Sequence, residues 1–145
     1  MEIIKFRDIL DAVRNAPDLA PHDGMTFCNV ALDRVLGLCG IPRIVTSKGE
    51  PMLANDMIDF IENSPDWKKV DGQVACARAS QGILVVACQC EVLHGHVCPV
   101  YPSPMGYSAS WQKEVPIVSN VGKTVGVMRA SQAFRTEPDY YGVKI

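Results

Sequence analysis

The sequence predicts an α+β domain in which N-terminal helices pack on one side of an antiparallel sheet. Apolar residues recur at helical spacing through the first half of the chain, whereas the second half holds short β-branched runs separated by turn residues. Helices followed by strands are typical of an α+β fold, because a doubly wound parallel sheet needs the two to alternate. A chain of 145 residues can bury one real core but is too short for two ordinary domains, so we expect residues 1–145 to form a single domain.

Two helices are predicted in the first forty residues. Apolar side chains follow the helical period over residues 2–15, and Pro17 stops the pattern. After a loop rich in Pro, Asp and Gly, Thr26 is a suitable N-cap for a second helix, whose apolar face begins at Cys28. The run "CGIP" ends this helix with a glycine followed by a proline.

Two more helices are predicted before the strands begin. The first covers about residues 55–63, with Asn55 as its N-cap and "SPDW" after its end. The second is short and rich in alanine, lies within "GQVACARASQG", and ends at Gly82.

The remainder of the chain is predicted to form strands. The run "ILVVACQC" at 83–90 is β-branched and is followed by the turn-like "EVLHG", which indicates a buried strand, and "HVCPVYP" is its expected hairpin partner. Pro99 lies in this partner and cannot donate to a ladder, so it belongs at an edge or a bulge. The runs "VPIVSNVG" and "YYGVKI" predict further strands, while "GVMRASQAF" fits either a helix or a strand.

Charge and hydropathy exclude several classes of function. The net charge is −2 and there is no long basic block, so we expect no electrostatic affinity for nucleic acid. The longest apolar stretch, "GILVVAC" at 82–88, is much too short to span a bilayer, and the N-terminus lacks the apolar region of a signal peptide. We therefore expect a soluble protein made in the cytoplasm, which reaches any outside target by specialised secretion, by lysis or after removal of a leader.

Cys28 is the first candidate for a chemical role. In the first turn of the predicted helix, unpaired backbone N–H groups and the helix dipole stabilise negative charge, so a thiolate is favoured there. Cys39 shares the same face but lies in the last turn, where the dipole has the opposite sign, and is expected to be an ordinary buried thiol. Taken alone, a cysteine in an apolar helix is more often a small core residue, so the catalytic interpretation needs a partner.

A histidine supplies this partner, because an imidazole that accepts the thiol proton activates the sulfur and later protonates the leaving amine. Of the three histidines, His22 lies in the loop before the second helix, His94 lies in the predicted hairpin turn, and His96 opens the second strand. Ladder hydrogen bonds hold a strand residue more rigidly than a turn residue, which favours His96 as the base. His94 is then expected to be a bystander or to line a substrate pocket.

Four segments resemble the papain-like NlpC-type and CHAP-type cell-wall amidases, and most of all the type VI secretion amidase effectors and related phage-type lytic enzymes. They are "TFCNVALDRVLGLCGIP", "ANDMIDFIENSPDWKKV", "ACARASQGILVVACQ" and "GHVCPVYPS", spread over about residues 24–103, with weaker similarity at 120–122 and 140–141. The resemblance implies a papain-like fold with Cys28 as the nucleophile and His96 as the base. It also implies cleavage of amide bonds in peptidoglycan stem peptides through a thioester acyl-enzyme, without a metal or an organic cofactor.

The residue that orients the imidazole varies in this family, and the sequence offers two candidates in "VSNVG". We expect Asn120, whose amide oxygen can accept from the ring and fix its tautomer. Ser119 is the alternative, since strand parity turns only one of the pair towards the active face, and a backbone carbonyl or a water is a further option. Ser119, Trp111 and His94 are also expected to contact substrate, although Trp111 equally fits a surface-anchoring aromatic. The backbone N–H of Cys28 is expected to stabilise the oxyanion.

The resemblance favours cleavage between D-glutamate and the diamino acid, with the muramyl linkage or a cross-link as alternatives. The expected partner is the stem peptide of bacterial peptidoglycan, joined by a cognate immunity protein if the enzyme is a toxin. We expect the protein to be a monomer that acts at the cell wall. A toxin, a phage lysin and a wall-remodelling enzyme all fit the residues equally well.

A zinc site is the main alternative, because "CQCEVLHGHVC" gathers five thiol and imidazole side chains within eleven residues. The five are Cys88, Cys90, His94, His96 and Cys98. Their C-x-C and H-x-H spacing differs from the usual C-x₂-C knuckle, and the first two lie in a predicted core strand. The other alternative is a binding module that keeps the fold and engages a wall peptide without cleaving it. The six cysteines allow disulfides, although a chain of this length does not need them.

Overall fold

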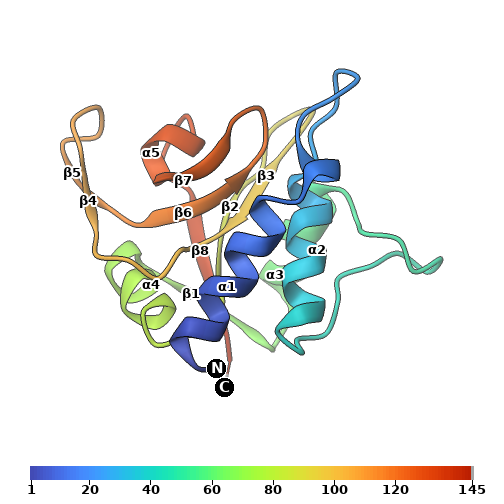
Figure 1. Ribbon diagram of the computed structural model, residues 1–145, viewed down its shortest axis with the longest axis horizontal. Coiled ribbons are helices and arrows are strands. Elements are labelled where there is room, and N and C mark those ends of the chain that lie inside the picture. The colour runs from blue at the N-terminus through green and yellow to red at the C-terminus, as the bar shows by residue number, and fades with distance from the viewer. Residues whose placement is uncertain (145) are drawn as a thin grey trace.

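A four-stranded antiparallel sheet with the strand order β1-β8-β2-β3 lies at the centre of the computed structural model, which describes residues 1–144 (Figure 1). Its strands are Trp67–Val70 (β1), Val85–Gln89 (β2), His96–Pro99 (β3) and Asp139–Val143 (β8). Two separate hairpins are formed by Gly106–Ser108 (β4) with Lys113–Val115 (β5) and by Ile117–Val121 (β6) with Val125–Arg129 (β7). The predicted α+β class with an antiparallel sheet is therefore confirmed.

Five α-helices and one 3₁₀ turn accompany these strands in residues 1–144. They are Ile3–Arg14 (α1), Pro17–Leu19 (η1), Cys28–Leu38 (α2), Ala54–Asn63 (α3), Gly72–Ala79 (α4) and Ala130–Ala133 (α5). The four helices that the sequence predicts are all present, with ends that differ by a residue or two. None of the helices in this part of the chain has both the length and the apolar character needed to cross a bilayer.

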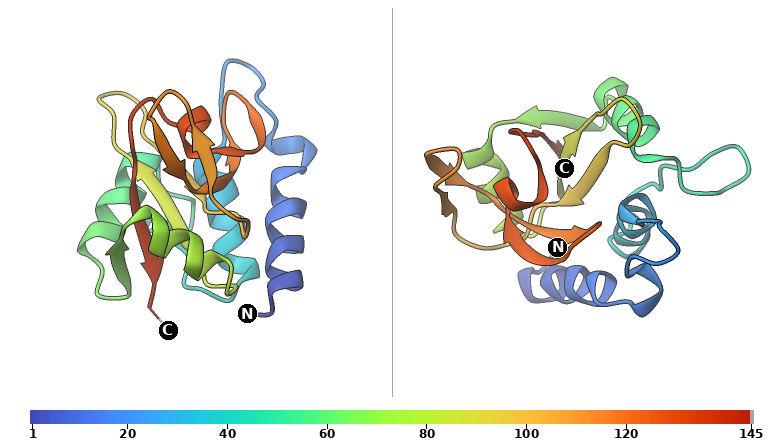
Figure 2. Two further views of the ribbon diagram at one scale, coloured as in Figure 1. Left: turned by 90° about the vertical axis from the view of Figure 1, so that its left-hand side faces the viewer. Right: turned by 90° about the horizontal axis from the view of Figure 1, so that it is seen from above.

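Helices cover both faces of the sheet, so the expectation of helices on one side is wrong (Figure 2). Because side chains alternate along a strand, Val86 and Cys88 of β2 point into a core shared with α1, α2 and α3. Val85 and Ala87 point the other way, into a second core shared with α4, α5 and β6. The buried alanines of α4 let that helix lie close to the sheet, which the sequence pattern alone does not indicate.

The predicted hairpin of β2 and β3 is confirmed, and its register pairs Gln89 with His96. β3 is an edge strand of the four-stranded sheet, which accommodates Pro99 as expected. Just beyond this proline, Val100 forms an antiparallel bridge with Val118 of β6. This bridge brings β6 alongside the strand that begins with His96.

The segment that fits either a helix or a strand contains both, because β7 ends at Arg129 and α5 begins at Ala130. The strands β1, β4 and β5 are not predicted from the sequence. They are three or four residues long, and β1 buries only Trp67 fully, so none of them carries a clear alternation of apolar and polar residues.

The two predicted N-caps, Thr26 and Asn55, are wrong. Phe27 holds the cap position before α2 and Leu53 holds it before α3, and neither side chain accepts a capping hydrogen bond. The first N–H groups of α2 therefore have no side-chain cap and are available to groups near Cys28. Asn55 uses its amide for a tertiary contact with the loop between β2 and β3 instead.

Candidate active site

His96 is oriented by a hydrogen bond from its ring to Asn120. The distance from His96 Nε2 to Asn120 Oδ1 is 2.6 Å. The amide cannot present its nitrogen to the ring instead, because Asn120 Nδ2 donates to the carbonyl oxygen of Thr124 at 2.9 Å, and a carbonyl only accepts. His96 Nε2 must therefore carry the proton and donate it to Asn120 Oδ1. In the neutral ring this leaves Nδ1 as a free proton acceptor.

Two further residues hold the plane of the His96 ring. Phe134 packs against it with ring centroids 5.0 Å apart and an interplanar angle of 52°. Gly122 approaches another part of the ring so closely that a Cβ at that position would lie 3.2 Å from His96 Cε1. A side chain on residue 122 would push the imidazole by a few tenths of an ångström, so the glycine keeps room for the ring.

Burial keeps His96 neutral near neutral pH. The low-polarity surroundings lower the pKa of the imidazole from its ordinary value of 6.5, because burial penalises the charged form. The hydrogen bond to Asn120 and the negative charge of Glu91 act in the opposite direction but do not overcome this effect. The ring is therefore available as a base rather than as a permanent cation.

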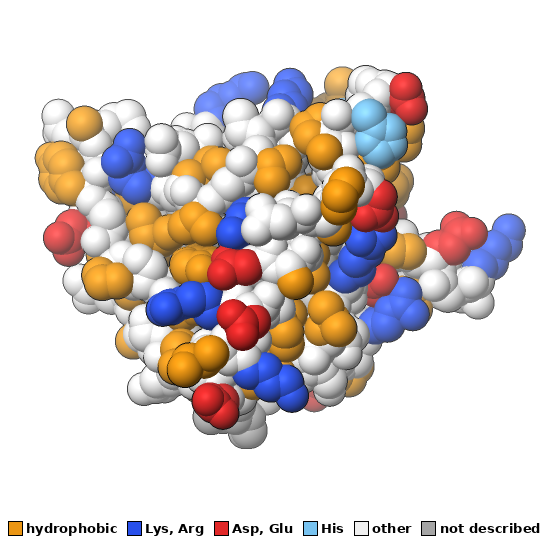
Figure 3. All heavy atoms as spheres, viewed as in Figure 1, with side chains coloured by type: hydrophobic (Ala, Val, Ile, Leu, Met, Phe, Trp, Pro, Cys, Tyr) orange, Lys and Arg blue, Asp and Glu red, His pale blue; other side chains and the backbone are white. Residues whose placement is uncertain are grey.

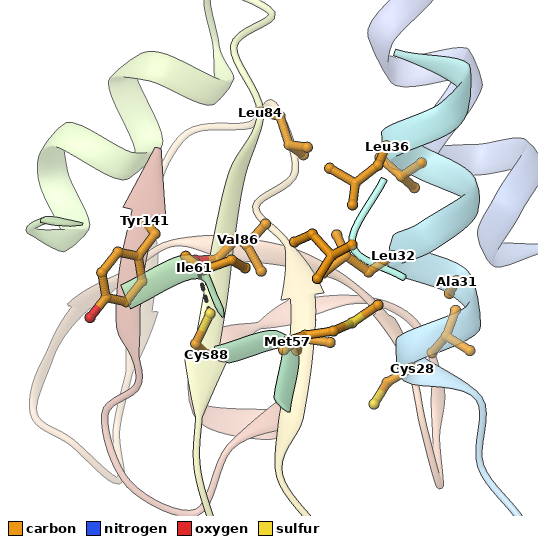
Figure 4. Packing of buried hydrophobic residues seen from close by; sticks show 14 of the residues in the cluster. Cys28, Ala31, Leu32, Leu36, Met57, Ile61, Leu84, Val86, Cys88 and Tyr141 are labelled. Atoms are coloured by element: carbon orange, nitrogen blue, oxygen red, sulfur yellow. Dashed lines mark hydrogen bonds between the residues drawn. The ribbon is translucent and has the colours of Figure 1, made fainter. Parts of the chain in front are cut away.

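Cys28 is the first residue of α2 and is buried in the core between that helix and the sheet. Figure 4 shows its sulfur directed from the start of the helix towards the strands. The backbone N–H of Val97 lies close enough to the sulfur to favour the thiolate form. Val97 directly follows His96 in β3, so the sulfur lies against the backbone of the strand that carries the imidazole.

The thiol of Cys28 is nevertheless protonated at rest, which corrects the expectation of a favoured thiolate. Burial raises its pKa above the ordinary value of 9.0, and the backbone N–H groups of Val97, Asn29 and Cys28 itself lower it only in part. Burial also raises the pKa of Cys39, but there the opposing effects come from the positive charges of the N-terminus and Lys5 rather than from backbone N–H groups. The two ends of α2 therefore differ in their backbone N–H groups, which lower the pKa of Cys28 but do not act on Cys39.

An open cleft of about 950 Å³ is formed by segments that adjoin the candidate site in the sequence, although Cys28, His96 and Asn120 do not themselves line it. It is lined by residues 24–26, Leu53, residues 89–94, Lys123 and residues 135–136. The first of these segments leads into Cys28, the third leads into His96, and Lys123 follows Asn120 by three residues. The loops that carry them gather at the upper end of the molecule in Figure 1. Glu91 belongs to the cleft and its charge acts on the His96 ring, which links the cleft to the candidate site.

Asn55 clamps the loop that leads into His96. Its Nδ2 donates to the carbonyl oxygen of Glu91 at 2.7 Å, and the backbone N–H of Glu91 donates to its Oδ1 at 3.3 Å. A Cβ on Gly95 would lie only 2.0 Å from Asn55 Oδ1, so residue 95 must be glycine for this contact to form. The sequence analysis assigns Asn55 to a helix cap and misses this role, because both loop residues are distant in the chain.

The structure separates the other predicted site residues. Ser119 is buried and accepts a hydrogen bond from Arg14 of α1 at 3.1 Å, so it does not face the His96 ring. His94 is exposed and lines the cleft. Trp111 is half-buried in the turn between β4 and β5, packs against the second core, and is not among the residues that line the cleft. Contact of these three side chains with substrate stays a prediction.

The five candidate zinc ligands do not converge in the described part of the chain. Cys88 and Cys98 point into opposite cores. Cys88 is paired with Val97 and shares its face of the sheet, and Cys98, the next residue after Val97, points to the other face. Cys90 is exposed. Within residues 1–144, no three His, Cys, Asp or Glu side chains are placed together to bind a metal ion, and all six cysteines are free thiols.

The fold and the site together define an α+β protein with a candidate cysteine–histidine–asparagine centre at the start of a helix and an adjacent edge strand. Comparison with protein-family models and with curated proteins found no match to this chain. The resemblance to cell-wall amidases therefore depends on the sequence motifs alone.

Replacement of Asn55 by alanine tests the clamp. The variant loses both hydrogen bonds to Glu91, so we expect the Glu91 amide to exchange faster with solvent and the free energy of unfolding to fall by about 1 kcal/mol. Hydrogen exchange followed by NMR and urea denaturation measure the two effects. Asn63→Ala is the control, because that amide bonds only within its own helix. Unchanged exchange at Glu91 in Asn55→Ala would show that the clamp does not hold the loop.

Proposed function

We propose that this protein is a papain-like cysteine hydrolase that cleaves amide bonds in peptidoglycan stem peptides. The observation that carries the proposal is the orientation of the His96 ring. Its Nε2 donates to Asn120, which leaves Nδ1 free to accept a proton, and the next residue of the same strand, Val97, presents its backbone N–H to the Cys28 sulfur. An oriented imidazole with one free nitrogen next to a thiol is the arrangement that nucleophilic cysteine catalysis needs. The substrate class follows from the resemblance in the sequence motifs.

In the first half of the reaction, His96 Nδ1 accepts the proton of Cys28 as the sulfur attacks the amide carbonyl carbon. A bond forms between carbon and sulfur, and the carbonyl oxygen becomes an oxyanion. The backbone N–H groups of Cys28 and Asn29, which have no partner within α2, are suited to stabilise this charge. His96 then returns the proton to the leaving nitrogen, the carbon–nitrogen bond breaks, and a thioester remains on Cys28.

In the second half, a water oxygen attacks the carbonyl carbon of the thioester while His96 accepts a proton from that water molecule. The carbon–sulfur bond breaks, the new carboxyl group leaves, and the proton returns to Cys28. The role of Asn120 throughout is to hold the tautomer and to accept from the imidazolium that forms transiently. At the end of the cycle Cys28 and His96 are back in their neutral resting forms, and one water molecule has been consumed.

The bond between D-glutamate and the diamino acid is the preferred target, with the muramyl linkage or a cross-link as alternatives. We propose that the protein is made in the cytoplasm and acts at the cell wall as a monomer after specialised secretion or lysis. A cognate immunity protein is the expected partner if it serves as a toxin. All of these assignments rest on the motif resemblance.

Digestion of purified peptidoglycan tests the proposal directly. We expect the wild-type protein to release defined stem-peptide fragments, identified by mass spectrometry, and Cys28→Ala and His96→Ala to release none while remaining folded by circular dichroism. Cys39→Ala is the matched control, since it removes a thiol from the C-cap of the same helix and should remain active. Retained activity in Cys28→Ala would refute the mechanism, and a wild type that binds peptidoglycan without releasing fragments would favour the binding-module alternative.

The pH dependence of kcat/KM provides a second test, because the resting pair is a neutral thiol and a neutral imidazole. Protonation of His96 abolishes its action as a base, and its pKa is lowered, so activity should be lost only below pH 6.5. Ionisation of Cys28 removes the proton that the leaving nitrogen needs, and its pKa is raised, so activity should decline only above pH 9.0. An alkaline limb below pH 9.0 would indicate a preformed thiolate–imidazolium pair instead, because the imidazolium would then be the group that loses its proton. An acid limb above pH 6.5 would contradict the lowered pKa of His96.

A further inference from the structure

The β6–β7 hairpin meets the main sheet at a narrow junction. β6 belongs to a separate two-stranded sheet, and it approaches β3 through the isolated bridge at Val100. Next to this bridge, the backbone N–H of Tyr101 donates to the carbonyl oxygen of Ile117 at 2.8 Å. The hydrogen bond between His96 and Asn120 spans the same two strands. Its geometry therefore depends on how firmly the junction holds β6 beside β3.

Helix α1 contacts both sides of this junction through polar side chains. On the β3 side, the hydroxyl of Tyr101 donates to Asp11 Oδ1 at 2.9 Å. On the β6 side, Arg14 Nη1 donates to Ser119 Oγ at 3.1 Å. Asp11 Oδ1 and Arg14 Nη1 are 2.8 Å apart, so an ion pair within one turn of α1 joins the two contacts. These four side chains form a continuous polar link from the end of β3 to β6, which we call the α1 clasp.

The guanidinium of Arg14 is held closely by its partners. Figure 3 shows acidic and basic side chains along the face of the molecule where α1 lies, but Arg14 differs from a solvated surface charge, because only 11% of its side chain is exposed. Asp11 supplies the opposite charge, and the guanidinium carbon lies 5.7 Å from the centroid of the Tyr101 ring. Movement away from this position would leave a largely buried charge without its partners, so the clasp has little freedom.

Ser119 and Asn120 transmit this constraint to the histidine. They are consecutive residues of β6, both are buried, and their side chains point to opposite faces of the strand. Arg14 holds Ser119 from the side of α1, and the backbone fixed in this way carries Asn120 towards the His96 ring. Thr124 orients the Asn120 amide within the β6–β7 hairpin, but contacts outside the hairpin must set the distance from the amide to β3.

We propose that Arg14 is a positioning residue for the His96 base. The α1 clasp holds β6 against β3, so that Asn120 Oδ1 stays within hydrogen-bond distance of His96 Nε2. Arg14 acts through Ser119 and Asn120 rather than on the reacting atoms. Its effect on the ring does not require the hydrolase, whereas its effect on catalysis rests on the proposed function.

Arg7 provides the matched control, because it is another arginine of α1 that packs on the same tyrosine. Its guanidinium carbon lies 5.9 Å from the centroid of the Tyr101 ring, and its Nη2 donates to the carbonyl oxygen of Pro102 at 3.1 Å. Both contacts are on the β3 side of the junction, so their removal leaves the link to β6 in place. Ser119→Ala is the complementary variant, since it removes the acceptor of Arg14 and leaves α1 unchanged.

Exchange of the His96 Nε2 proton with solvent, measured by NMR without substrate, tests the positioning role. We expect this proton to exchange about tenfold faster in Arg14→Ala than in the wild type, because the bond to Asn120 opens more often. Ser119→Ala should give the same increase, and the double variant should add nothing, because both changes break one contact. Arg14→Lys, which keeps a cationic donor, should restore part of the protection, and Arg7→Ala should keep the wild-type rate.

Thermal unfolding of the same variants separates positioning from a general loss of stability. A merely structural role would lower the Tm of Arg14→Ala and of Arg7→Ala and leave the exchange of the His96 proton unchanged. Wild-type exchange in both Arg14→Ala and Ser119→Ala would therefore overturn the proposal. An equal increase of exchange in Arg7→Ala would overturn it as well.

Digestion of peptidoglycan by these variants extends the test to catalysis. We expect the kcat of Arg14→Ala and Ser119→Ala to fall about tenfold with little change in KM, and Arg7→Ala to match the wild type. Faster exchange in variants of a protein that cleaves nothing would support the clasp and refute the hydrolase. Unchanged exchange in variants of a protein that does cleave would overturn the clasp and leave the hydrolase standing.

Discussion

The hydrogen bond between His96 Nε2 and Asn120 Oδ1 is the constraint on which the candidate site depends. The direction of this bond depends on the carbonyl oxygen of Thr124. This oxygen can only accept, so it binds the Asn120 Nδ2 group and turns the Oδ1 atom towards the His96 ring. The bond joins β3 to β6 across the edge of the main sheet, where Phe134 and Gly122 confine the ring. A turn in the β6–β7 hairpin thereby determines which nitrogen of an imidazole in another strand is free to take a proton.

Burial gives this site a neutral resting state. The same exclusion of water raises the pKa of Cys28 and lowers the pKa of His96, so each group moves away from the charged form. The backbone N–H groups at the start of α2 oppose this effect for the sulfur, and their influence would grow as negative charge develops during attack. The site is therefore suited to proton transfer during the reaction rather than to storage of a thiolate beforehand.

Hydrophobic periodicity is enough to predict α1 to α4 and the β2–β3 hairpin, and with them the elements that carry the thiol and the imidazole. The finer features depend on tertiary contacts. Asn55 has the local preference of a cap, but the loop before β3 claims its amide. The alternation of side chains along β6 does not decide between Ser119 and Asn120. Both side chains are buried, because Ser119 faces Arg14 of α1 and Asn120 faces His96 of β3. Lys123 and Arg135 share a cleft only after the chain has folded.

The tautomer of His96 is the most direct test of the account, because the proposed chemistry needs a free lone pair on Nδ1. Two-bond ¹H–¹⁵N correlation spectra of the imidazole at neutral pH distinguish the two nitrogens. The structure predicts a neutral ring with the proton on Nε2 and an unprotonated Nδ1. A ring with its proton on Nδ1, or one protonated on both nitrogens, would contradict the account, since Nδ1 would then have no lone pair to accept the Cys28 proton.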